Sequence, residues 1–311
     1  MGLPVQRGTG TMTATRRKQL YREYLGHYLT FACAALLIVI TVAIVVFIAL
    51  QGLATFFANH INPWQFLFST KWQPDRPLSE GGPLVGTLAF TVGSIAVSLL
   101  AVLIGGPLSI VAAVFMVEIA PGWGRRVLQP AVEILAGIPS VVYGWIGLSL
   151  LVPFLRRELH TLGFSLLAGC LVLAVMIIPT VVSLTADSLR SLSRDLKEAA
   201  YALGSTRWQT ISRVILPAAR PGIMTAIVLG LARAFGEALA VQMVIGNTRS
   251  LPTSILSPMT TLTSAITIDM GYTIPGTAWN NALWSMSLLL LLITFGFIIL
   301  IRLVGRGRVY R

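Results

Sequence analysis

Arg233 and Glu237 are the charged residues of the apolar stretch 221–248, and they lie four positions apart. A charge near the middle of a bilayer costs roughly 3 to more than 10 kcal/mol, so such residues usually face the protein interior and serve a function. Side chains four positions apart share one face of a helix, so the spacing predicts that Arg233 meets Glu237. Because a guanidinium group is a planar fork of donors, we expect Arg233 to bind an oxyanion and Glu237 to hold it otherwise. A self-neutralising pair that only fixes the rotation of the helix is the alternative.

Gly137, Pro139 and Ser140 interrupt another apolar stretch, 127–155. Proline lacks a backbone N–H and clashes with the preceding turn, so the sequence predicts a broken helix at this point. A break inside a membrane can offer free backbone groups to a passing ion. It can also be a packing kink, at which small residues let helices approach closely. Both interpretations remain open for these three residues.

Apolar residues make up 55% of the 311 residues and charged residues only 11%. A soluble domain usually carries about 25% charge, so the composition excludes an ordinary soluble enzyme. A hydrocarbon core of about 30 Å needs roughly 20 residues of helix. Stretches of this length predict an all-α, polytopic membrane protein with six transmembrane helices, at 29–51, 84–117, 127–155, 162–186, 221–248 and 282–301.

The second stretch, 84–117, is longer than one straight crossing requires, and it contains Gly105, Gly106 and Pro107. Sharp kinks in helices are usually found at proline or at glycine pairs. The sequence therefore predicts one long helix that is broken at Pro107. Two short half-crossings are the alternative.

Lysine and arginine are distributed unevenly between the loops. If both ends of the chain lie on one side, the segments on that side hold 17 of these residues and the opposite segments hold five. Loops rich in Lys and Arg remain in the cytoplasm, so both termini are predicted to be cytoplasmic. The net charge of +12 is then a consequence of topology, and we expect no nucleic acid as a partner. The basic tail 1–28 is instead expected to lie near anionic membrane lipid.

Sequence patterns for common catalytic and cofactor sites are absent from the chain. It contains no Gly-x-x-x-x-Gly-Lys-Ser/Thr loop for ATP phosphates and no His-Glu-x-x-His pattern. Its three histidines are far apart, which disfavours a metal site. We therefore expect no cofactor or metal in this chain, and no enzyme activity.

The charged stretch 187–220 separates the fourth and fifth apolar stretches. Its composition predicts two short helices around a turn at Gly204, with the second helix ended by Pro217. A pair of amphipathic helices resting on lipid is the simplest interpretation of this pattern alone.

The same stretch contains Glu198-Ala199-Ala200-x-x-x-Gly204, followed after nine residues by Val214-x-Leu216-Pro217. This pattern resembles the EAA loop of ABC importer permeases, with Val214 in place of the usual isoleucine. The resemblance implies that the loop docks on a separate ATPase subunit and passes its motion to the membrane helices. The residues that would form this coupling loop are Glu198, Ala199, Ala200, Gly204, Leu216 and Pro217.

Two further segments, 133–144 and 232–247, resemble the third and fifth spans of phosphate importer permeases of the PstC type. Phe235 and Gln242 depart from the common pattern. The resemblance covers about 84–303, which would be a MetI-like permease domain following the first span and outer loop at 29–83 and preceding a cytoplasmic tail at 304–311. It implies a second permease subunit of the PstA type and an ATPase dimer of the PstB type that uses ATP and Mg²⁺. It also implies a phosphate-binding protein of the PstS type outside the bacterial inner membrane.

Other functions remain open at this point. The same machine could carry another oxyanion, such as sulfate or molybdate. A stand-alone secondary transporter or channel would be expected to show internal repeats of its spans, which this sequence lacks. A membrane scaffold would not need a charged pair inside a span.

Overall fold

The computed structural model describes residues 14–306; residues 1–13 and 307–311 lie outside the described part. The chain separates into two compact units, one up to Leu50 and one from Gln51 onward. Helix α1 (Ala14–Phe57) is continuous across this boundary. Of the predicted basic tail 1–28, residues from Ala14 onward are helical, and the part before Ala14 lies outside the described residues.

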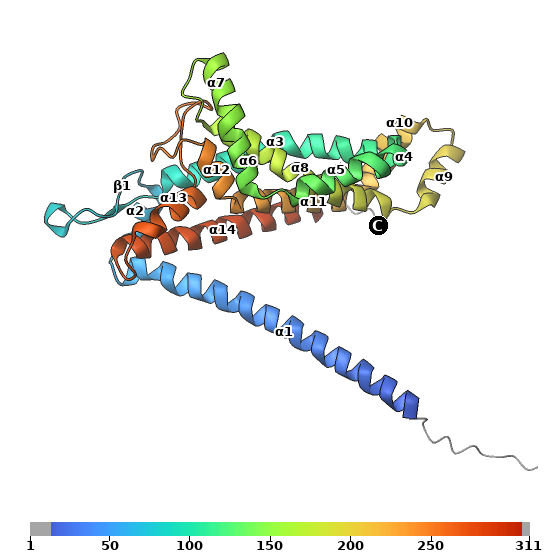
Figure 1. Ribbon diagram of the computed structural model, residues 1–311, viewed down its shortest axis with the longest axis horizontal. Coiled ribbons are helices and arrows are strands. Elements are labelled where there is room, and N and C mark those ends of the chain that lie inside the picture. Colours follow the sequence, from blue (N-terminus) through green and yellow to red (C-terminus); the bar gives the residue numbers. More distant parts are fainter. Residues whose placement is uncertain (1–13, 307–311) are drawn as a thin grey trace, which may run out of the picture. The chain divides into compact units, whose positions relative to one another are not determined.

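The described residues contain five helices long and apolar enough to cross a membrane, and one bent pair that can form a sixth crossing. The prediction of an all-α protein with six spans is thus confirmed (Figure 1). The spans are α1, α3 (Leu88–Val114) with the π-helical η2 (Phe115–Ile119), the bent pair Arg126–Gly137 and Ser140–Leu159, α8 (Leu166–Arg190), the stretch Arg207–Gly236, and α14 (Ala278–Arg306).

The bent pair and the stretch Arg207–Gly236 are each composed of several segments. The bent pair contains η3 (Gly124–Leu128), α5 (Gln129–Gly137), α6 (Ser140–Ile146), the π-helical η4 (Gly147–Leu151) and α7 (Val152–Leu159). The other stretch contains α10 (Arg207–Thr210), the π-helical η5 (Ile211–Ile215) and α11 (Leu216–Gly236).

Short elements connect the spans. Between α1 and α3 lie α2 (Pro63–Phe68), η1 (Leu78–Glu80) and an antiparallel pair of strands, β1 (Trp72–Gln73) and β2 (Leu84–Val85). The others are α4 (Pro121–Trp123), α9 (Arg194–Ala202), α12 (Leu239–Val244), α13 (Leu262–Asp269) and η6 (Met270–Tyr272).

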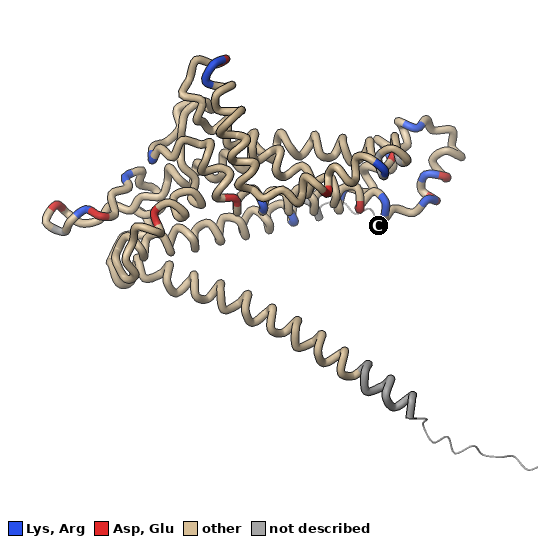
Figure 2. Tube along the Cα trace, in the orientation of Figure 1, with Lys and Arg blue, Asp and Glu red and all other residues tan. Residues whose placement is uncertain are grey.

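Within the second unit, the short elements gather at opposite ends of the long helices. Figure 1 shows α9 and α10 at one end, and α2, β1 and α13 at the other. We call the first the loop end and the second the hairpin end. In Figure 2, charged residues lie around the loop end, at the tip of the β1–β2 hairpin and at the tip of α7, while the long helices carry few charges.

The prediction of a broken helix at Pro107 is wrong, because α3 continues through Pro107 to Val114. Pro107 lies on an exposed face of the helix, where its ring has room. Membrane helices tolerate a single lost backbone hydrogen bond when nearby hydroxyl groups and neighbouring helices compensate. The carbonyl group that loses its helical partner to Pro107 is that of Leu103, four residues earlier.

Gly105 instead permits the close contact between α3 and α8. A Cβ atom added at Gly105 would lie 2.8 Å from the carbonyl oxygen of Ala174, on α8. The two helices share a buried apolar cluster around this point. Its members include Val97 and Ala101 from α3, Leu173 and Ile177 from α8, and Ala234 from α11.

The contact at Gly105 predicts that Gly105→Ala is destabilising. The added methyl group must push α3 away from the backbone of α8, so we expect the free energy of unfolding to fall by about 1–3 kcal/mol. Unfolding of the purified protein in mixed micelles, followed by circular dichroism, measures this change.

Gly106→Ala is the matched control, since its Cβ would meet only the Val102 side chain, at 3.8 Å. Alanine also favours a helix over glycine by about 0.5–1 kcal/mol. Equal destabilisation by the two substitutions would contradict the assigned role of Gly105.

Candidate functional site

Arg233 lies near the end of α11 and is half-buried. Its Nη1 donates to Oγ1 of Thr180 over 2.6 Å. Thr180 belongs to α8, so this hydrogen bond joins the two helices at the depth of the arginine. The partner of the guanidinium group is therefore a neutral hydroxyl group.

Glu237 does not continue the helix that carries Arg233. Helix α11 ends at Gly236, and Glu237 has an extended backbone with φ −76° and ψ 127°. Its Oε1 accepts a hydrogen bond from the N–H of Ala240 over 3.1 Å, at the first turn of α12. Its own carbonyl oxygen accepts from Oγ1 of Thr263 over 2.8 Å.

The prediction that Arg233 and Glu237 share a helix face and meet is therefore wrong. No ion pair joins them in the part of the chain that the structure describes. The physical reason is that the carboxylate caps the start of α12, where unpaired backbone N–H groups and the helix dipole favour a negative charge. Gly236, a poor residue for a helix interior, marks the end of α11.

Residues from several elements line a small cavity at Glu237, which is too narrow for a water molecule. Its polar members are Ser94 and Ser98 from α3 and Thr261 and Thr263 at the start of α13, and apolar residues such as Val97 and Leu173 complete it. The hydroxyl oxygen of Ser94 accepts from the N–H of Leu262 over 2.8 Å, which ties α3 to α13. Sequence reasoning missed these residues, although two serines spaced by four in an apolar stretch were a visible signal.

The break at Gly137, Pro139 and Ser140 is confirmed, and the two halves of the span meet at 94°. Ile138 and Pro139 are extended between α5 and α6. The hydroxyl group of Tyr143 donates to the carbonyl oxygen of Leu135 over 2.7 Å, so a carbonyl near the end of α5 is satisfied. The break thus leaves this carbonyl group occupied by the protein itself.

Helix α6 packs directly on α12, the helix that Glu237 caps. A Cβ atom added at Gly144 would lie 2.8 Å from the Cα atom of Ala240. One added at Gly147 would lie 2.9 Å from Cγ1 of Val244. The broken third span and the segment after Arg233 are therefore in contact, although about 100 residues separate them.

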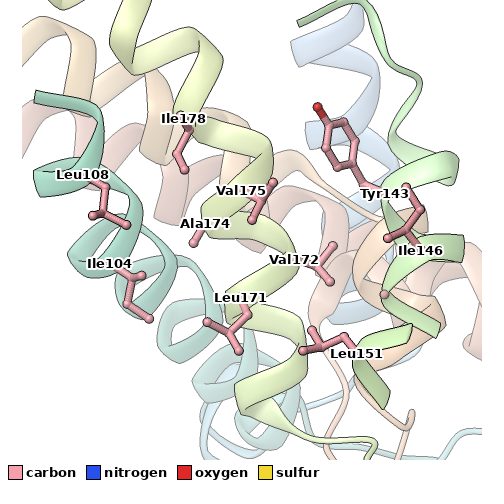
Figure 3. Close-up of a pocket in the computed structure, with 11 residues that line it drawn as sticks. Ile104, Leu108, Tyr143, Ile146, Leu151, Leu171, Val172, Ala174, Val175 and Ile178 are labelled. Carbon is pink, nitrogen blue, oxygen red and sulfur yellow. The ribbon is translucent and has the colours of Figure 1, made fainter. Parts of the chain in front are cut away.

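An apolar cavity of about 420 Å³ lies between α3, α8 and the α6–η4 segment (Figure 3). The side chains that Figure 3 labels around it are aliphatic apart from Tyr143. A buried anion needs paired charges or hydrogen bonds, so this cavity is not a suitable site for an oxyanion. Hydrogen-bond donors that suit an oxyanion are found instead at the guanidinium group of Arg233.

The predicted coupling loop contains the expected turn. Gly204 has φ +79°, in the left-handed region that favours glycine. The next helix starts with Thr206 and Gln209, whose side chains cap each other's backbone N–H groups. Ala200 is buried, and its carbonyl oxygen accepts from the hydroxyl group of Ser205 over 2.7 Å.

The prediction that Pro217 ends the second loop helix is wrong. The helical stretch that starts at Arg207 continues through Leu216 and Pro217 to Gly236, so it is also the start of the fifth span. Pro217 occupies the first turn of α11, directly after the π-helical η5. The π-helical turn before it shifts the backbone hydrogen bonds from the i−4 to the i−5 pattern, so Pro217 lies where the regular α-helical bonding already changes.

Several apolar side chains of the loop are exposed. Leu203 is 89% exposed and Trp208 is 66% exposed. Tyr201 and Leu196 are also among the exposed large hydrophobic residues, and the Glu198 side chain lies among them at the surface. Exposed apolar side chains with adjacent charges are typical of a surface that another protein covers.

The sequence is similar to those of known transport proteins over most of its length. Residues 105–309 match the family described as binding-protein-dependent transport system inner membrane component. The chain is 51% identical over 298 residues to the probable ABC transporter permease protein YqgH of Bacillus subtilis, an alignment that covers 96% of this chain and 95% of the relative. It is 36% identical over 305 residues to the phosphate transport system permease protein PstC of Mesorhizobium japonicum, covering 91% and 89%.

A solved structure agrees with the fold over most of the chain. A chain of a bacterial alginate ABC transporter, in complex with an alginate pentasaccharide-bound periplasmic protein, is similar with a TM-score of 0.63 at 15% identity. The match covers 93% of this chain and 96% of that one. At this identity the likeness concerns the fold alone.

The geometry around Glu237 predicts how its substitutions affect stability. Glu237→Ala removes the oxygen that caps α12, which should lower the free energy of unfolding by about 1 kcal/mol. Glu237→Gln keeps an acceptor oxygen at the same place and should lose clearly less. Titration with denaturing detergent, followed by circular dichroism, compares the two variants; equal losses would show that Glu237 does not act as a cap.

Proposed function

The chain belongs to the family of binding-protein-dependent transport system inner membrane components, and on that premise we propose that it forms the anion pathway of an ATP-driven phosphate importer together with a second permease subunit. Members of this family are multi-pass permeases of the inner membrane with a MetI-like fold, which agrees with the expected architecture. Phosphate as the substrate is suggested by the relatives named PstC.

The hydrogen bond between Arg233 and Thr180 is the observation that carries this proposal. A hydroxyl partner holds the guanidinium group in place but does not cancel its charge. An arginine inside a span therefore retains its attraction for an anion and has donors free to bind it. The proposed role of Glu237 changes accordingly: it positions α12 beside the pathway and does not hold Arg233.

Gly137, Pro139 and Ser140 are proposed to shape the pathway by bending the third span. The bend brings α6 against α12, the helix that Glu237 caps. Because the carbonyl group of Leu135 is already bonded to Tyr143, these residues act through the course of the helix. A pathway formed in this way needs no dedicated metal or cofactor in this chain.

The coupling loop is proposed to dock on an ATPase dimer of the PstB type, which supplies ATP and Mg²⁺ chemistry to the complex. Its residues Glu198, Ala199, Ala200 and Gly204 lie in α9 and in the turn after it. Leu216 and Pro217 begin α11 and lie within the fifth span. The exposed Leu203 and Trp208 give the surface its apolar character.

The remaining partners follow from the same proposal. A second permease of the PstA type would complete the pathway, and a phosphate-binding protein of the PstS type would deliver the anion at the hairpin end. The excess of Lys and Arg in the loops on that side supports a cytoplasmic position for the loop end and both termini. Transport of sulfate or molybdate is the second candidate, and competition by these anions in an uptake assay distinguishes it from phosphate transport.

Arg233→Ala should reduce phosphate uptake. Loss of a hydrogen bond to a charged group costs about 1.5–3 kcal/mol, which corresponds to a decrease of roughly 10- to 100-fold. Arg233→Lys keeps the charge but loses the planar fork, so it should recover only part of the activity. Uptake of labelled phosphate by vesicles containing the assembled complex measures both variants.

Arg157→Ala is the control for this experiment, because Arg157 is an exposed arginine in an ion pair with Glu158 on α7. It should leave uptake unchanged. Near-normal uptake by Arg233→Ala, at normal yield of the complex, would assign Arg233 to a structural role and contradict the proposed pathway.

Gly204→Val should uncouple ATP hydrolysis from uptake or prevent assembly. A non-glycine residue in the left-handed region costs roughly 1–2 kcal/mol and would distort the turn between the loop helices. Asparagine tolerates this region better, so Gly204→Asn should retain more phosphate uptake per ATP hydrolysed. No Cβ clash complicates the comparison, because nothing lies within 4 Å of the added atom. A Gly204→Val complex with a normal uptake-to-hydrolysis ratio would contradict the docking role of the loop.

A further inference from the structure

Both helices of the coupling loop contact the end of α3. The ammonium group of Lys197, on α9, lies 2.7 Å from Oε1 of Glu118. The guanidinium group of Arg207, at the start of α10, donates to the carbonyl oxygens of Glu118 and Ile119. Lys197 and Arg207 follow Glu118 by 79 and 89 positions in the sequence, yet both contact this residue. We call Glu118, Lys197 and Arg207 the α3 clamp.

Each contact of the α3 clamp has a clear physical cause. The last carbonyl groups of a helix lack partners within the helix, and positive charge is favoured at this end. Arg207 therefore satisfies backbone groups at the end of η2, the segment that continues α3. Lys197 neutralises the one carboxylate of the same segment.

The burial of Glu118 distinguishes this ion pair from an ordinary surface pair. The Glu118 side chain is only 8% exposed and that of Lys197 is 30% exposed. By contrast, the Arg157–Glu158 pair has side chains that are 82% and 47% exposed. Exposed pairs contribute little to stability, whereas removing one partner of a buried pair leaves an unpaired charge.

A buried apolar cluster involves the same segments as the α3 clamp. Val114 and Met116 at the end of α3 share a buried cluster with Ile211 and Ile215 of η5, which follows α10. Val182, Ala186 and Leu189 of α8 belong to the same cluster. The loop is thus fixed to the membrane helices by a packed interface, with the charged contacts at its edge.

We propose that Lys197 and Arg207 are positioning residues that fasten the coupling loop to α3, so that motion of the loop is transmitted along this helix. The proposal rests on the proposed docking of the loop on an ATPase. Helix α3 and η2 form one helical stretch from Leu88 to Ile119, without a break at Pro107. Such a helix can act as a lever between its two ends.

The other end of this lever reaches the candidate anion pathway. Ser94 and Ser98 of α3 line the cavity beside Glu237. Twenty residues separate Ser98 from Glu118, which is roughly 30 Å of helix. A displacement of α3 at the loop end would therefore be passed to α13 through the hydrogen bond between Leu262 and Ser94.

The test uses the complete transporter in lipid vesicles, with labelled inorganic phosphate as the probe and ATP hydrolysis measured in parallel. Lys197→Met keeps the aliphatic stem and removes the charge, and we expect phosphate uptake per ATP to fall about tenfold because Glu118 loses its partner. Lys197→Arg restores a charge and should recover at least half of the normal ratio. Arg157→Gln, in the exposed pair, should leave the ratio unchanged.

A double variant tests whether the two residues act together. In the Lys197→Met background, Glu118→Gln should cause little further loss, because the interaction is already absent. If the Lys197→Met complex is not recovered from membranes, phosphate uptake per ATP hydrolysed is measured in Glu118→Gln alone, which removes the same ion pair. Additive losses, a normal ratio in the single variants, or a Lys197→Arg variant as poor as Lys197→Met would each overturn the proposal.

The Gly204→Val variant distinguishes a failure of the α3 clamp from a failure of the proposed docking of the loop on an ATPase. Uncoupling by Gly204→Val with a normal ratio in Lys197→Met would leave the docking role intact and exclude the α3 clamp. Normal ratios in both variants would contradict the docking role itself.

Discussion

Backbone polar groups inside a membrane have no water to bond, so each interruption of a helix must be satisfied by the protein. In this chain, side chains from the other side of a break or from another element satisfy the interruptions. Glu237 accepts from the N–H of Ala240, and Tyr143 donates to the carbonyl oxygen of Leu135. Arg207 donates to the carbonyl groups at the end of η2. Glu237 and Tyr143 thus each stabilise an interruption of a helix.

This requirement explains the arrangement around Arg233. The acidic residue nearest to it in the sequence is committed to α12, so the arginine is held by the hydroxyl group of Thr180. A neutral partner fixes the geometry and leaves the positive charge uncompensated. Among the residues that the structure describes, none forms an ion pair with Arg233, which is consistent with its proposed role in attracting an anion.

Close contacts between helices give the second unit its continuity from the loop end to the hairpin end. Gly105 lets α3 lie against the backbone of α8, and Gly144 does the same for α6 and α12. Small residues at such contacts allow van der Waals packing where lipid provides no hydrophobic driving force between helices. Because α3 is unbroken, it connects the packed cluster at the loop end with the hydroxyl groups beside Glu237.

The sequence by itself determined the six spans, the bend at Pro139 and the left-handed turn at Gly204, because hydropathy, proline and glycine act locally. It did not determine that α11 ends before Glu237, since that depends on α12 and on Thr263, which is 26 residues further along the chain. Pro107 was misjudged for a related reason: the local rule predicts a break, but its exposed position and the contact of Gly105 with α8 decide the outcome. The partners of Arg233 and Glu118 also come from distant elements. Only the tertiary structure could decide them, because long-range packing and hydrogen bonding outweigh the spacing of residues within one helix.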